Sequence, residues 1–162
     1  MPFNIDEILA VAVQIERNGA AFYRKAAEGT ADEELRKLLL ELAEMEDGHL
    51  EVFSRMREEL TDRDKESTAF DPNGQAELYL RAYASGKIFD AQLDPVERLG
   101  SLGSPEEVLK FALDVEKDSV VYYTGMRDLV PERLGKDKVD GIIGEEMKHV
   151  ALLSVRLAEL GK

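Results

Sequence analysis

The chain has 162 residues and a mass of 18.1 kDa, which fits one compact domain, and we expect residues 1–162 to form a single domain. It carries 21 Lys and Arg against 34 Asp and Glu, a net charge of −13 that repels nucleic acid phosphates and anionic membrane surfaces. Cysteine is absent, which excludes disulfides, thiolate metal sites and iron–sulfur clusters, so any metal must bind nitrogen and oxygen ligands. The start lacks a basic stretch followed by an apolar run, and no segment approaches about 18 consecutive apolar residues. We therefore expect a soluble, cytoplasmic protein that binds neither nucleic acid nor membranes.

Two helices are predicted in the first part of the chain. The segment Asn4–Glu7 has the spacing of a capping box, which predicts a helix over residues 5–28. The segment Thr30–Glu33 repeats this capping pattern and predicts a second helix that continues to about residue 60. Because the connection is short, the two helices should pack as an antiparallel hairpin over residues 5–60.

The segment 61–104 loses this regularity. Proline and glycine interrupt it repeatedly, and only one short helix is predicted, over residues 75–85. The segment is long enough to travel the whole length of a helix, so the next long helix can run parallel to the second one. We therefore interpret it as a crossover.

A second hairpin is predicted over residues 105–160. The segment Ser104–Glu107 places serine at the cap, proline at the first helical position and glutamate at the third, which predicts a helix to about residue 129. After Pro131 and Gly135 a fourth helix is expected over residues 136–160.

An internal repeat relates the two hairpins. Ile8–Tyr23 (ILAVAVQIERNGAAFY) aligns without gaps on Val108–Tyr123 (VLKFALDVEKDSVVYY) at a shift of 100 residues. The same shift relates two Glu-x-x-His motifs, at residues 46–49 and 146–149. The fold class is therefore all-α, a four-helix bundle with one long crossover, which is the ferritin-like arrangement.

Each long helix carries one stripe of residues at steps of three and four, which should face the bundle interior. The fourth stripe ends with Leu160 and is interrupted by Arg156. Six polar residues interrupt the stripes near their middle, and they are the candidate metal ligands: Glu16, Glu46, His49, Glu116, Glu146 and His149.

Four buried carboxylates need positive charge, because burial without compensation would cost several kcal/mol for each one. No Lys or Arg lies on the stripes near this level, whereas two divalent cations would balance four carboxylates with both imidazoles neutral. The chain has only two histidines, and each follows a glutamate by three residues. This pattern predicts a pair of metal ions, and carboxylate and imidazole ligands suit iron and manganese without excluding zinc.

The sequence around these residues resembles the rubrerythrins, a family of ferritin-like di-iron carboxylate proteins. The resemblance is carried by IERNGAAFY around Glu16, EDGH at 46–49, DVEKDSVVYY around Glu116 and EMKH at 146–149. It implies two iron ions per chain, bridged by the glutamates of the two Glu-x-x-His motifs. It also implies that Glu16 and Glu116 are terminal ligands, that each histidine binds one ion, and that all six residues are catalytic.

Three further residues bear on the chemistry. Tyr23 and Tyr123 are either plain core residues or hydrogen-bonding partners of the ligands, with the two interpretations about equally weighted. Ser119 stands where rubrerythrins place a further glutamate, so four glutamates and two histidines also resemble the ferroxidase site of bacterioferritin. A cysteine-ligated rubredoxin module is impossible within these 162 residues, so electrons should come from an external donor protein such as a rubredoxin.

The leading functional hypothesis is an oxidoreductase that reduces hydrogen peroxide or dioxygen at a di-iron site. One alternative is a ferritin-like ferroxidase that handles or stores iron, and another is a metal-bearing bundle that acts as an interaction partner in stress responses. We expect a homodimer, whereas iron storage would require a closed shell.

Overall fold

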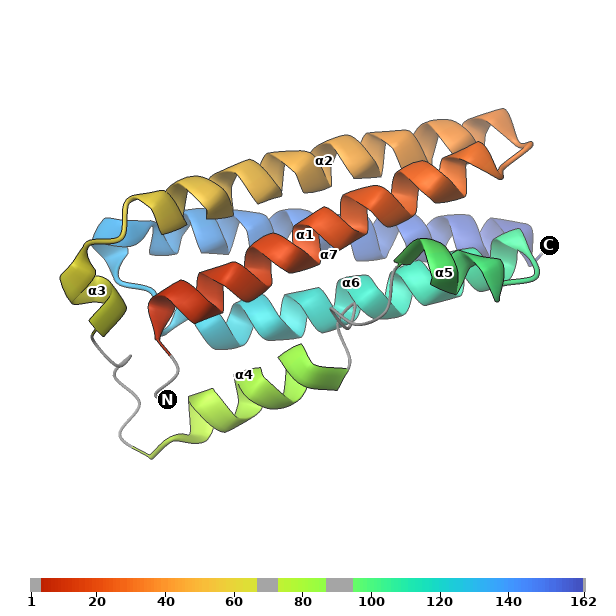
Figure 1. Cartoon of the computed structure of the whole chain (residues 1–162). Coiled ribbons are helices and arrows are strands. Elements are labelled where there is room, and N and C mark those ends of the chain that lie inside the picture. The colour runs from red at the N-terminus through yellow and green to blue at the C-terminus, as the bar shows by residue number, and fades with distance from the viewer. Residues whose placement is uncertain (1–3, 67–72, 87–94, 162) are drawn as a thin grey trace.

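The computed structural model describes residues 4–66, 73–86 and 95–161, and every regular element in this part of the chain is a helix. The four long helices are α1 (Ile5–Glu28), α2 (Glu33–Glu58), α6 (Pro105–Arg127) and α7 (Lys136–Leu160). Figure 1 shows α1 antiparallel to α2, and α6 antiparallel to α7, with α2 and α6 running in the same direction. The predicted four-helix bundle with a crossover between its second and third long helices is therefore confirmed.

Helices α1 and α6 begin where the capping patterns predict. The Asn4 side chain accepts a hydrogen bond from the backbone N–H of Glu7 at 2.9 Å, and the Glu7 carboxylate accepts one from the backbone N–H of Asn4 at 3.3 Å. Ser104 accepts from the backbone N–H of Glu107 at 3.2 Å, with Pro105 at the first helical position.

The N-cap of helix α2 lies two residues later than the predicted cap at Thr30. Its N-cap is Asp32, whose carboxylate accepts hydrogen bonds from the N–H groups of the second and third helical residues at 2.9 and 3.1 Å. The hydroxyl of Thr30 instead donates to the carbonyl oxygen of Ala26 at 2.7 Å and closes the end of α1. Asp32 also pairs at 2.8 Å with Arg156, the arginine that interrupts the fourth stripe, so this charge lies at the end of the bundle.

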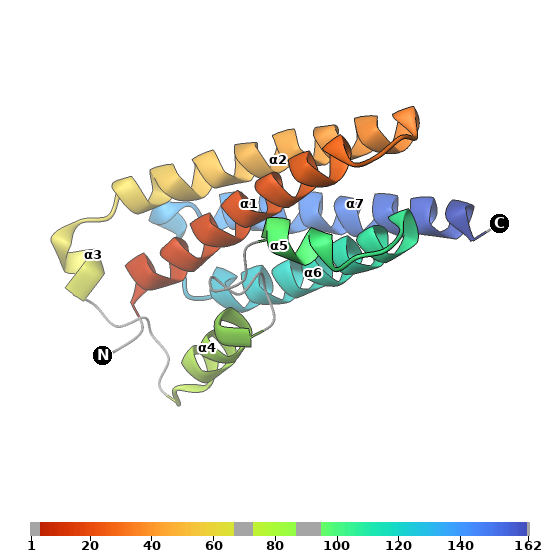
Figure 2. The same cartoon turned by 45° about the vertical axis from the view of Figure 1, so that its right-hand side comes forward.

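The crossover contains more helix than predicted. In its described part it forms three short helices, α3 (Asp62–Glu66), α4 (Gln75–Gly86) and α5 (Pro95–Gly100), of which the sequence predicted only α4. The other two have five and six residues, too few to show a helical repeat. The expected irregular stretches at 67–72 and 87–94 lie outside the described residues. Figures 1 and 2 show the three helices following the bundle from one end to the other.

Helix α4 packs on α6 at a glycine. A Cβ atom at Gly125 would lie 2.6 Å from the ring of Tyr79, so the absence of a side chain allows the two helices to approach closely. The Tyr79 hydroxyl donates to the backbone carbonyl of Val121 at 3.2 Å, and Leu80 is fully buried.

The bundle interior contains two apolar clusters. One includes Phe53, Tyr122 and Met126, and the other includes Phe22 and Leu39. The predicted inward stripes are buried, except that Leu160 is 38% exposed because it ends α7 beyond the last apolar layer.

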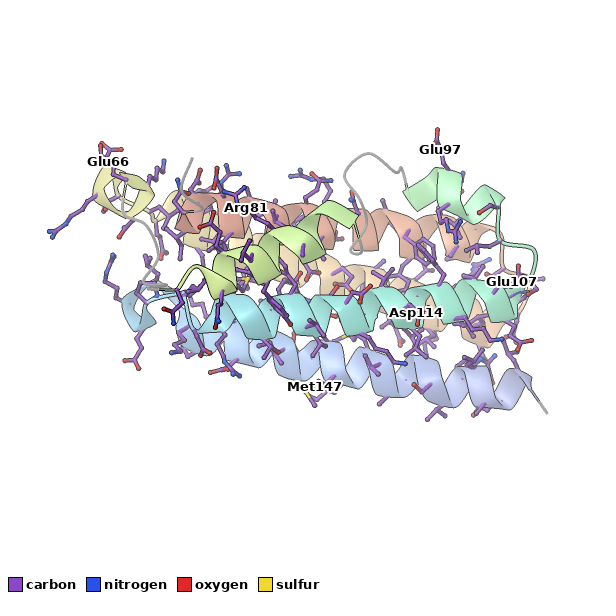
Figure 3. All side chains as sticks on the ribbon, turned by 90° about the horizontal axis from the view of Figure 1, so that it is seen from below. Glu66, Arg81, Glu97, Glu107, Asp114 and Met147 are labelled. Atoms are coloured by element: carbon purple, nitrogen blue, oxygen red, sulfur yellow. The ribbon has the colours of Figure 1, made fainter. Side chains whose placement is uncertain are left out.

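The outer face of α7 is apolar over several turns. Met147 projects from this face into solvent, as Figure 3 shows, and Leu152 and Val155 are also exposed. None of the described helices combines the length and the apolar character that a membrane span requires.

Replacing the cap of α6 by Ser104→Ala should lower the free energy of unfolding by about 1 kcal/mol, because the N–H of Glu107 loses its partner. Urea unfolding followed by circular dichroism measures this. Ser154→Ala is the matched control, since Ser154 is an exposed serine inside α7 whose loss should change stability by less than about 0.5 kcal/mol. Equal stability of Ser104→Ala and the unmodified protein would contradict the assigned cap.

Candidate metal centre

The structure brings together all six residues that the sequence nominated as ligands. They come from four different helices, because each stripe turns its polar members toward the bundle axis. None is more than 3% exposed: Glu16, Glu46, His49, Glu116, Glu146 and His149. Phe53 and Tyr123 belong to one apolar cluster and Tyr23 and Leu42 to the other, so this layer is enclosed by apolar side chains.

The six side chains divide into two sets of four, and within each set the potential ligand atoms lie within 4.8 Å of one another. The first set contains Glu16 and His49, and the second contains Glu116 and His149. Glu46 and Glu146 belong to both sets, which is the position that a carboxylate bridging two ions requires.

Both imidazoles turn Nδ1 toward the carboxylates. Nδ1 of His49 lies 3.0 Å from Oε1 of Glu146 and 3.5 Å from one oxygen each of Glu16 and Glu46. Nδ1 of His149 lies 3.1 Å from Oε2 of Glu146, 3.3 Å from Oε1 of Glu46 and 3.4 Å from Oε1 of Glu116. Each imidazole can therefore offer one nitrogen to one ion.

The two tyrosines hydrogen-bond to the proposed terminal carboxylates in a crossed arrangement. The Tyr23 hydroxyl of α1 donates to Oε1 of Glu116 on α6 at 2.5 Å, and the Tyr123 hydroxyl of α6 donates to Oε1 of Glu16 on α1 at 2.5 Å. Both tyrosines are buried. Of the two interpretations of the sequence, the structure favours the hydrogen-bonding one.

Ser119 is buried near this layer but offers no carboxylate. Its hydroxyl donates to the backbone carbonyl of Val115 at 3.0 Å, one helical turn earlier. The serine therefore does not replace the carboxylate that the rubrerythrin pattern places at this position.

Two residues in contact with the histidines were not nominated from the sequence. Oε2 of Glu145 lies 2.5 Å from Nε2 of His49, and Sδ of Met45 lies 3.4 Å from Nε2 of His149. Each precedes the glutamate of a Glu-x-x-His motif, and the 100-residue repeat places the two at equivalent positions. Their position directly before each Glu-x-x-His motif was the sequence signal that could have identified them. Glu145 offers a carboxylate to His49, whereas Met45 offers a thioether to His149, so the outer nitrogens of the two imidazoles have chemically different partners.

Burial and mutual repulsion raise the pKa of every carboxylate in the layer. Burial, followed by the charge of Glu146, raises the pKa of Glu16 to about 7. Burial and neighbouring carboxylates likewise raise the pKa of Glu46, Glu116 and Glu146.

The imidazoles show the complementary effect. Burial alone would lower the pKa of His149, but the close carboxylates of Glu116, Glu146 and Glu46 outweigh it and raise the pKa to about 12. The pKa of His49 is raised as well, because its carboxylate partners outweigh burial. Without metal the site therefore retains protons on its potential ligands.

The donor set fits a pair of divalent cations. Oε2 of Glu16, Oε2 of Glu146 and Nδ1 of His149 are buried side-chain atoms without a hydrogen-bond partner. No lysine or arginine of the described residues forms an ion pair with any of the four carboxylates. Unpaired nitrogen and oxygen atoms in two converging sets are the arrangement that ions of charge +2 would satisfy.

The fold and the site together define the chain as a ferritin-like helical bundle with a paired carboxylate and histidine centre. A family model described as rubrerythrin matches residues 7–101, more than half of the chain, and the chain belongs to the rubrerythrin family. A crystal structure of a protein from Thermotoga maritima, described as ferritin-like and diiron-carboxylate, has the same fold. The two chains share 28% sequence identity and a TM-score of 0.75, over 98% of this chain and 97% of that chain. No curated protein sequence matches the chain.

Glu46→Ala should lose both metal ions, whereas Glu16→Ala should retain about one, because Glu46 belongs to both ligand sets and Glu16 to one. Elemental analysis after anaerobic reconstitution with ferrous iron measures the metal content, and the unmodified chain should hold two ions. Glu44→Ala, which removes an exposed glutamate of the same helix, is the control and should also hold two. Loss of both ions from Glu16→Ala but not from Glu46→Ala would reverse the assignment of bridging and terminal ligands.

The metal-free protein should lose stability as the pH rises from about 5 to about 8. The folded state holds protons that the unfolded chain releases near the ordinary pKa values of 4.5 for glutamate and 6.5 for histidine, so the raised pKa values favour folding at low pH. Thermal unfolding of chelator-treated protein across this range measures the slope. Metal-loaded protein should show the opposite slope, because bound ions displace the protons. Stability of the metal-free form that rises with pH would show that the carboxylates are ionised or exposed.

Proposed function

We propose that the protein is a di-iron oxidoreductase that reduces hydrogen peroxide or dioxygen with electrons from an external donor protein. The observation that carries the proposal is the sharing of Glu46 and Glu146 between two ligand sets, since this geometry suits two ions acting as one redox unit. Membership of the rubrerythrin family and the likeness to a protein described as diiron-carboxylate support iron as the metal.

When bound, a pair of ferrous ions supplies the two electrons that convert one hydrogen peroxide and two protons into two waters. The protein must hold these ions in a fixed place and provide protons to a site that solvent hardly reaches. Its side chains divide these tasks between them.

The tyrosines hold the terminal carboxylates. Burial, followed by the charge of Glu116, raises the pKa of Tyr23 well above its usual value, and burial with the charge of Glu16 does the same for Tyr123. Both hydroxyls therefore keep their protons and act as fixed hydrogen-bond donors, which orient the carboxylates.

Protons can reach the layer through His49 and Glu145. The ring of His49 has Nδ1 among the carboxylates and Nε2 beside Glu145, whose side chain is 46% exposed. This pair links the enclosed layer to solvent, and a proton can be held between Nε2 of His49 and Oε2 of Glu145 at 2.5 Å.

In this proposal, another protein supplies the electrons. The 162 residues contain no cysteine and hence no iron–sulfur or rubredoxin-type centre of their own. A small redox protein such as a rubredoxin is the donor that we propose.

The anaerobic diferrous protein should be oxidised faster by hydrogen peroxide than by dioxygen at equal concentration, and turnover should require an added donor. Stopped-flow absorbance measures both rates. Ser119→Glu should shift the ratio further toward peroxide by restoring the missing carboxylate, whereas Ser119→Ala, the matched control, should leave the ratio within about twofold.

Faster oxidation by dioxygen would favour the oxidase or ferroxidase alternative. Light scattering would then separate an enzyme of low oligomeric state from a closed storage shell. If neither oxidant reacts and stability does not depend on metal, the result would favour the third hypothesis, a bundle that acts as an interaction partner in stress responses.

A further inference from the structure

A groove of about 460 Å³ lies between α2 and α7, directly over the ligand layer. The two helices run antiparallel as neighbours, and both views show this (Figures 1 and 2). Four residues from each helix line the groove, and they are Met45, Gly48, His49, Val52, Lys138, Gly141, Ile142 and Glu145. One proposed ligand, His49, is thus part of the groove wall. A larger cavity of about 610 Å³, lined partly by the α1–α2 turn and the α5–α6 connection, touches none of the six.

The imidazole of His49 separates the groove from the ligand layer. Its Nδ1 faces Glu146, Glu16 and Glu46, while its Nε2 faces Glu145 in the groove. His49 is only 3% exposed, so the ring forms the floor of the groove. A small molecule that passes the edge of this ring would reach the layer behind it.

Two glycines keep the groove open. A Cβ atom at Gly48 or Gly141 would meet no atom within 4 Å, so larger side chains would extend into free space there. The remaining walls are formed by the apolar residues Met45, Val52 and Ile142 together with Lys138, and the polar contact of His49 with Glu145 completes the lining. Apolar walls favour a neutral molecule over a hydrated ion, and small size suits a passage closed by a single ring.

We propose that the α2–α7 groove is the route by which a small neutral molecule with an O–O bond approaches the ligand layer, past the edge of the His49 imidazole. This inference rests on the proposed function, which supplies hydrogen peroxide and dioxygen as the two molecules of that kind. Oε2 of Glu145 contacts Nε2 of this imidazole at 2.5 Å, and Gly48 and Gly141 provide the space.

Gly141→Leu tests the route, because leucine would fill the groove without altering a ligand, and leucine suits a helix better than glycine does. Gly144→Leu is the matched control, since Gly144 is an equally open, exposed glycine of the same helix that does not line the groove. The oxidation rate of the anaerobic diferrous protein should fall about fivefold or more in Gly141→Leu, for both oxidants, and stay unchanged in Gly144→Leu.

A second measurement is independent of turnover. In zinc-loaded, diamagnetic protein under dissolved dioxygen, the methyl groups of Met45 and Val52 should show paramagnetic relaxation that falls about threefold or more in Gly141→Leu. Gly144→Leu should retain it. This measurement reports whether a small neutral molecule occupies the groove even if the protein reduces neither oxidant.

The outcomes separate the two proposals. Unchanged oxidation rates in Gly141→Leu, in a protein that does turn over, would overturn the route and leave the function intact. Absence of turnover in the unmodified protein would overturn the function, and the relaxation measurement alone would then decide on the groove. Relaxation equal in both variants would overturn the route. A fall for one oxidant only would overturn the route as a common path for both oxidants.

Discussion

The confinement of four carboxylates in an apolar interior is the constraint on which the rest of this structure depends. Carboxylates carry a cost of several kcal/mol each when buried unpaired, and the described residues offer no lysine or arginine to offset it here. Two kinds of positive charge can neutralise the buried carboxylates, which are bound protons and metal ions. The raised pKa values of the glutamates and histidines describe the first state, and the unpaired oxygen and nitrogen atoms point to the second. Folding, metal binding and proton uptake are therefore coupled at one layer of the bundle.

The same layer connects the two halves of the chain. Helices pack most closely within each hairpin, α1 with α2 and α6 with α7, whereas α2 and α7 meet less intimately. The hydrogen bonds of Tyr23 with Glu116 and of Tyr123 with Glu16 run between hairpins, as does the contact of His49 with Glu146. Looser packing of α2 against α7 leaves space for both the ligand sets and the groove. The polar layer is thus at once the candidate metal site and a polar link between the repeats, in addition to the apolar clusters that both hairpins share.

Much of this could be predicted from the sequence, because helical periodicity and capping are local signals. Steps of three and four placed Glu16 and His149 inside the bundle without any knowledge of the fold. Helices of five or six residues show no such period, so α3 and α5 were missed, and Asp32 was a better cap than Thr30 because it reaches two N–H groups. Glu145 escaped notice because its role depends on how α7 faces α2, and a single stripe contains no information on the neighbouring helix.

The position of the polar layer between two apolar clusters also fixes how the helices align along their length. If α2 slid by one turn against its neighbours, Phe53 or Leu42 would replace a ligand within the layer, and Glu46 or His49, respectively, would enter an apolar cluster. Apolar residues alone tolerate such a shift, since one leucine packs much like the next, whereas a buried polar layer does not. The six polar residues of this layer therefore fix the register of four long helices, whose apolar stripes would otherwise permit several alignments. A bundle of this kind acquires its unique structure from the residues that are least suited to its core.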